Sequence, residues 1–150
     1  MPTPTSAAHA QAVRAFSRTV SIRLLLWSVL SMAGGALLWR WGTPFGRGFG
    51  VQSLGWGAVD AVIAGSGLVG QRPSRDTLAA SESDHAACKL RRLLSFNALL
   101  DVGYVAGGVW LARTKGRANP GWRGQGWGIV VQGAFLFWFD LAHALRVPRN

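Results

Sequence analysis

The stretch "FNALLDVGYVAGGVWLA", from Phe96 to Ala112, decides the fold class. It is almost entirely apolar, and as a helix it is long enough to cross the ~30 Å of hydrocarbon in a bilayer. Three other runs of similar length are also nearly free of charge, which places the four predicted spans at about 20–39, 51–70, 93–112 and 126–145. The 150-residue chain is therefore predicted to be an all-α, polytopic membrane protein with one domain of four transmembrane helices.

The two halves of the chain resemble each other. "GGALLWR" at 34–40 aligns with "GGVWLAR" at 107–113, and "GWGAV" at 55–59 aligns with "GWGIV" at 126–130. A two-helix unit repeated in tandem keeps its orientation, so this pattern predicts a parallel internal repeat. The four helices are then expected to form two hairpins.

Charge is strongly unbalanced, with 16 Lys and Arg against six acidic residues and a net charge of +10. The basic residues are scattered over short loops instead of covering one polar face, so we expect them to contact lipid phosphates and no nucleic acid. Ten lie near the N-terminus, in the segment 71–92 or at the C-terminus, and six lie in the other two loops. This excess predicts an inner-membrane protein with a cytoplasmic N-terminal segment 1–19, a cytoplasmic linker 71–92 and both termini in the cytoplasm.

Tryptophan is concentrated beside the two loops assigned to the outer side. Indole rings prefer the headgroup boundary, so these residues predict a Trp belt on that side. They are Trp39, Trp41, Trp56, Trp110, Trp122 and Trp127.

The first span has two interpretations. The basic N-terminus followed by "LLLWSVLSMAGG" resembles a signal peptide with a cleavage site after Ala33. However, the apolar run continues to Trp39, and the basic region that precedes it is unusually long. We therefore favour an uncleaved first helix.

Two carboxyl groups, those of Asp60 and Asp101, are placed near the centres of their spans. An Asp at this depth costs ~2.5–3.5 kcal/mol on insertion scales. Three explanations remain open: the carboxyl groups are protonated, they accept hydrogen bonds from neighbouring helices, or they hold a cation or a basic group of a partner protein.

Polar and small residues recur at helical spacing in each span, so that they share one face while bulky apolar residues face lipid. These faces predict a buried polar cluster that binds an ion or proton, formed by Asp60, Asn97, Asp101, Tyr104, Gln132, Asp140 and His143. A supporting stripe of polar and small residues comprises Ser28, Ser31, Gly35, Ser53 and Gly57. The cluster is interpreted as a path for protons or cations, as a structural hydrogen-bond network, or as a contact with a larger complex.

Signatures of enzymes and cofactor sites are missing from the sequence. The Gly-rich loops lack the Lys-Ser/Thr ending of a P-loop, and "GSGLVG" at 65–70 follows no predicted strand. Cys88 is the only cysteine, and the three histidines lack ligand spacing. We therefore expect no catalytic residue, no cofactor and no metal.

"LLDVGYVAGG" in the third span and "GWGIVVQGAFLFWFD" in the fourth resemble segments of a group of small, uncharacterised bacterial integral membrane proteins with four helices. The resemblance is strongest at Asp101, Tyr104, Gln132 and Asp140. It implies the four-helix topology, and the group has no known function to carry over.

These observations favour proton- or cation-linked transport or binding at Asp60 and Asp101. The alternative is a non-catalytic accessory or structural subunit of a larger membrane complex. The expected partners are the lipid bilayer and either further copies of the chain or a larger membrane complex, because four short helices make a narrow bundle.

Overall fold

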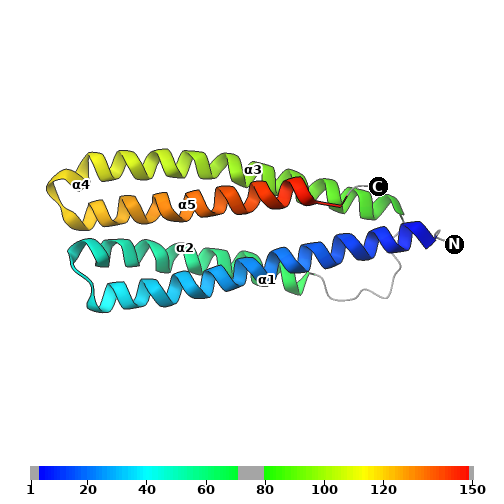
Figure 1. Cartoon of the computed structure of the whole chain (residues 1–150), viewed down its shortest axis with the longest axis horizontal. Helices are drawn as coiled ribbons and strands as arrows, with labels where there is room; N and C mark the ends of the chain where they lie inside the picture. Colours follow the sequence, from blue (N-terminus) through cyan, green and yellow to red (C-terminus); the bar gives the residue numbers. More distant parts are fainter. Residues whose placement is uncertain (1–3, 71–79, 149–150) are drawn as a thin grey trace.

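The computed structural model describes residues 4–70 and 80–148, with side chains described in 8–70 and 84–148. These residues are helical apart from short turns (Figure 1). The elements in chain order are α1 (Pro4–Trp41), α2 (Pro44–Val69), α3 (Ala80–Arg113), the short α4 (Lys115–Ala118) and α5 (Pro120–Arg146). The predicted all-α class is confirmed.

The helices are longer than the predicted spans. With 38 residues, α1 is about 57 Å long, so it continues well beyond the thickness of a bilayer core. The part of segment 1–19 that is described belongs to α1, and residues 80–92 of the predicted linker belong to α3. Residues 71–79 of that linker lie outside the described part of the chain. The sequence patterns did not predict α4.

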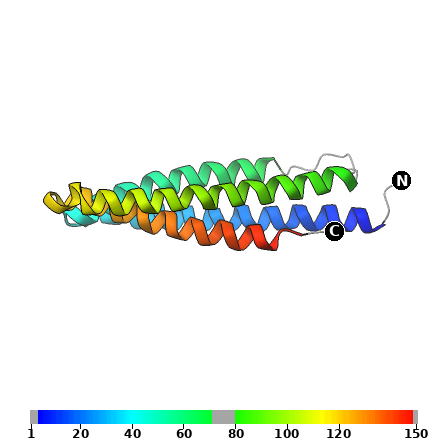
Figure 2. The ribbon, with the colours of Figure 1, turned by 90° about the horizontal axis from the view of Figure 1, so that it is seen from above.

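The helices form two hairpins that run along a common long axis (Figure 2). One pairs α1 with α2 and the other pairs α3 with α5, while α2 and α5 join the hairpins. The start of α1 and the end of α5 lie at one end of the bundle, and both hairpin turns lie at the other (Figure 1). We call these the terminal end and the turn end.

Glycine allows the helices of each hairpin to approach closely. A Cβ on Gly35 would lie 2.8 Å from the carbonyl oxygen of Gly50, and one on Gly108 would lie 2.7 Å from that of Gly126. Helices in hydrocarbon gain most of their association energy from this kind of close packing, because lipid removes the hydrophobic driving force.

Both long helices that follow a turn begin in the same way. The Thr43 side chain accepts a hydrogen bond from the Gly46 N–H, and Pro44 occupies the first helical turn of α2. The Asn119 side chain accepts from the N–H groups of Gly121 and Trp122 in the first turn of α5, which begins at Pro120. A polar cap followed by proline satisfies free N–H groups and fixes φ where a helix starts.

At the terminal end, the first halves of α1 and α3 pack together beyond the central part of the bundle. An apolar cluster joins α1, α3 and the end of α5, and Nε2 of His9 lies 3.2 Å from Oδ1 of Asp84. The buried members of the cluster are Val13, Val20, Ala87, Leu94, Ala144 and Val147.

Three helices are long and apolar enough to cross a membrane, over Ala8–Trp41, Asp84–Arg113 and Pro120–Arg146. The Gly-rich helix α2, which contains the second predicted span, is not among them. Large apolar side chains cover the outside of the bundle, with Leu30, Val62 and Leu99 between 67% and 72% exposed. Soluble proteins rarely expose so much apolar surface, which suggests a membrane protein.

Candidate functional site

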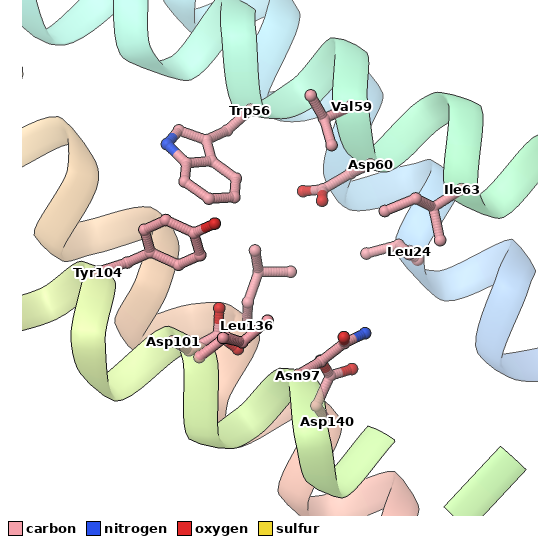
Figure 3. Close-up of a pocket in the computed structure, with 11 residues that line it drawn as sticks. Leu24, Trp56, Val59, Asp60, Ile63, Asn97, Asp101, Tyr104, Leu136 and Asp140 are labelled. Atoms are coloured by element: carbon pink, nitrogen blue, oxygen red, sulfur yellow. The ribbon is translucent and has the colours of Figure 1, made fainter. Parts of the chain in front are cut away.

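A cavity of about 180 Å³ lies between α2 and α3, with further walls from α1 and α5 (Figure 3). This volume is far above the ~10–15 Å³ that one water molecule needs. We call it the acid cavity, because three of its lining residues are aspartates. It is lined by Leu24, Trp56, Val59, Asp60, Ile63, Asn97, Leu100, Asp101, Tyr104, Leu136 and Asp140.

Asp60 and Asp101 point into the cavity from facing helices, α2 and α3 (Figure 3). Their residues are only 3% and 4% exposed. In each carboxyl group, Oδ2 is buried and has no hydrogen-bond partner. Buried polar atoms are normally paired, so two unpaired oxygen atoms in one cavity need an explanation.

Asp140 reaches the same cavity from α5 and is 7% exposed. It lies beside the side chain of Asn97 from α3 (Figure 3). The third acid therefore has a polar side chain beside it.

Two aromatic rings form one edge of the cavity. The rings of Trp56 and Tyr104 meet edge to face, with centroids 4.8 Å apart and planes at 78° (Figure 3). Trp56, which was predicted as part of the Trp belt, also forms part of the wall of the cavity. The signal for this placement was its position four residues before Asp60, on the same face of α2.

Gln132 lies outside the acid cavity, in the contact between α1 and α5. Its side-chain carbonyl accepts a hydrogen bond from Trp27 Nε1 at 3.0 Å, and its amide donates to Ser31 Oγ at 3.2 Å. The Trp27 ring stacks on Phe135 at 3.6 Å between centroids. Both polar ends of Gln132 are thus partnered within the helix pair.

His143 also lies outside the cavity, near the end of α5. Its Nδ1 is 2.6 Å from the carbonyl oxygen of Phe139, and its Nε2 is 3.2 Å from an Arg23 guanidinium nitrogen. A neutral ring fits both contacts, with Nδ1–H donating to the carbonyl and Nε2 accepting from Arg23. Sequence reasoning missed both Arg23 and Trp27, although with Ser31 they recur every four residues along α1.

The supporting stripe is buried where α1 meets α2. Ser28 is fully buried and its hydroxyl donates to the Leu24 carbonyl at 2.8 Å. A Cβ on Gly57 would lie 3.0 Å from the Ser28 carbonyl oxygen. Gly35 and Ser53 are buried in the same contact, whereas Ser31 is buried beside Gln132 of α5.

The three acids are distributed around the cavity and are not gathered at one point. Among residues 8–70 and 84–148, no group of three or more His, Cys, Asp and Glu side chains is placed to hold a metal ion. The lining residues include no Lys or Arg. What the cavity offers is a set of separate carboxyl oxygens, which accept hydrogen bonds and attract positive charge.

The fold and the cavity define an all-helical protein with three helices able to span a membrane and three buried acids. A family model described as "Family of unknown function (DUF6992)" matches residues 23–141, which include all three acids. The chain belongs to this family. No curated protein and no solved structure matches the chain.

Proposed function

We propose that all four long helices cross the membrane and that the protein belongs to a bacterial inner membrane. The support for a fourth span is the position of α2, a 26-residue helix packed along the apolar part of α1 and against α5. Its low hydropathy reflects buried Gly, Ser and Asp residues that face other helices, as the packing of membrane helices requires.

We also propose that the terminal end lies in the cytoplasm. The excess of Lys and Arg in the segments predicted for this side supports that orientation. At the turn end, exposed Trp41, Trp110, Trp122 and Trp127 would then form a Trp belt at the outer headgroups. The repeated pairing of "GGALLWR" with "GGVWLAR" would correspond to the two hairpins.

For its activity, we propose proton- or cation-linked transport or binding at Asp60 and Asp101, without catalysis. One observation carries this proposal: each residue has a buried carboxyl oxygen with no hydrogen-bond partner, and both line one cavity. Acids inside a membrane are costly and usually belong to ion or proton pathways. A cation or a proton bound there would satisfy the two oxygens.

The test is proton flux in proteoliposomes that contain the purified full chain and a pH-sensitive dye. We expect flux above that of empty vesicles, and its loss in Asp60→Asn and Asp101→Asn. The matched control is Asp84→Asn, which removes an exposed carboxyl group on α3 outside the cavity. Flux that persists in both cavity variants would refute the proposal.

The alternative proposal, an accessory subunit of a larger membrane complex, is favoured by the helical extension at the terminal end. Its α1 and α3 segments continue past the central bundle and offer a surface for another protein. Mild solubilisation from native membranes followed by mass spectrometry tests this role. A partner protein in fixed stoichiometry, together with no proton flux by the isolated chain, would support the accessory role. A complex of several copies of the chain alone would support a structural role.

A further inference from the structure

The acid cavity has a neighbour of a different character. A second pocket of about 350 Å³, which we call the outer pocket, is lined by Gln52, Gly55, Trp56, Val59 and Tyr104. Trp56, Val59 and Tyr104 also line the acid cavity. These three residues thus form a wall between a space bordered by carboxyl groups and a space that is mainly aromatic and apolar, with Gln52 as its polar member.

The mouth of the acid cavity is apolar. Val59 and Ile63 on α2, and Leu100 and Tyr104 on α3, are between 44% and 51% exposed, although the three acids behind them are buried. In the described part of the chain, the backbones of α2 and α3 hardly approach each other, and the rings of Trp56 and Tyr104 make contact across the space between them. A molecule would therefore reach the acids between two helices, across a surface that faces lipid if α2 and α3 span the bilayer.

The chemistry of the two spaces selects a ligand with two parts. Unpaired carboxyl oxygens need N–H donors or positive charge. The faces of Trp and Tyr rings attract cations and also stack with other rings. In the described part of the chain, no three acids converge on one point, which argues against a compact divalent ion, since such ions demand several oxygen ligands at about 2.0–2.6 Å.

We propose that the acid cavity and the outer pocket together bind a protonated amine that carries an aromatic or apolar substituent and enters from the bilayer between α2 and α3. The ammonium group would donate to the unpaired oxygens of Asp60 and Asp101, and the substituent would lie against Trp56 and Tyr104. This inference rests on the proposed function and names the class of its ligand.

Three probes separate the parts of the proposal: benzylammonium has charge and ring, methylammonium has only charge, and benzyl alcohol has only the ring. Binding to the purified full chain in detergent is measured by saturation-transfer NMR and calorimetry. The double variant Asp60→Asn/Asp101→Asn gives the background from detergent partitioning. We expect benzylammonium to bind at least about tenfold more tightly than either other probe, because only it uses both spaces.

Two variants then test how much the Trp56 ring contributes to the affinity for benzylammonium. Trp56→Leu is expected to reduce the preference for benzylammonium over methylammonium. The control is Trp110→Leu, which changes an exposed Trp on α3 that lines neither pocket and should leave this preference unchanged.

Equal binding of benzylammonium to the wild type and the double Asp variant would overturn the inference. If neither amine binds while proton flux still depends on Asp60 and Asp101, the ligand class is wrong and the proton function stands. If no amine binds and no proton flux depends on Asp60 and Asp101, the proposed function and the ligand class are both refuted.

Discussion

Trp27 Nε1 donates a hydrogen bond to Gln132 Oε1 across 3.0 Å, which joins α1 of the first hairpin to α5 of the second. Gln132 is 2% exposed, and its amide donates in turn to Ser31. Contacts between the hairpins decide whether the bundle holds together, because each hairpin could pack internally without the other. A polar link buried at this contact is therefore expected to contribute to stability.

Gln132→Leu and Trp27→Phe should each destabilise the bundle, and the double variant should cost less than the sum of the two. Hydrogen bonds between membrane helices are worth ~0.6 kcal/mol on average and up to ~1.7 kcal/mol, so the coupling energy should lie in this range. Unfolding in a detergent–SDS titration, followed by circular dichroism, measures it. Strict additivity would show that the hydrogen bond contributes nothing.

Gly48→Ala and Gly124→Ala should separate the two hairpins. A Cβ on Gly48 would collide with the carbonyl oxygen of Gly121, and one on Gly124 with that of Phe45. Backbone has little freedom to yield, so a cost of about 1–3 kcal/mol is expected for each.

Gly55→Ala on α2 and Gly65→Ala further along it are matched controls for that prediction. Their Cβ atoms would meet nothing within 4 Å. Both variants should keep or raise the wild-type stability in the same SDS titration, because alanine favours a helix over glycine. If the control and test variants lose the same amount of stability, the loss does not come from the α2–α5 contact.

Helix positions and buried faces were largely predictable from the sequence, because charge-free length and helical spacing depend on the chain itself. Asp60, Asn97, Asp101, Tyr104 and Asp140 were predicted as one buried group, and the structure places them around one cavity. The prediction that Tyr104 is buried was wrong, since it is 44% exposed at the mouth, and Asn97 is half-buried. The predicted group also included Gln132 and His143, which lie instead in the contact between α1 and α5.

Spacing along one helix could not separate these two contacts. It shows which residues share a face, but the rotation of that face toward one neighbour or another depends on interhelical packing. In α5, Asp140 turns toward α3, where Asn97 lies beside it, and His143 turns toward Arg23 on α1. The partner of each side chain therefore depends on residues that are distant in the chain.

Cys88 provides a test of the proposed orientation, because it is the only cysteine and is exposed near the terminal end. In intact cells, a membrane-impermeant maleimide should leave Cys88 unlabelled. Ala118→Cys in a Cys88→Ser background places a thiol at the turn end and should be labelled. After permeabilisation both should react. Labelling of Cys88 in intact cells would reverse the orientation.

Asp60→Leu and Asp101→Leu should stabilise the bundle while they abolish proton flux. Each removes a buried carboxyl oxygen that has no hydrogen-bond partner, and such an atom costs about 1–3 kcal/mol. Leucine at this depth also favours the membrane, whereas Asp opposes it. Residues kept for function often cost stability in this way.

Asp140→Leu is the contrasting variant, since it removes the carboxyl group that lies beside Asn97 and leaves this half-buried amide facing an apolar side chain. It should lower stability in the SDS titration, opposite in sign to the other two variants. If Asp60→Leu and Asp101→Leu instead destabilise the bundle as much as Asp140→Leu does, then all three acids belong to a structural network. The cavity would in that case hold the helices together, and its unpaired oxygens would not mark a binding site.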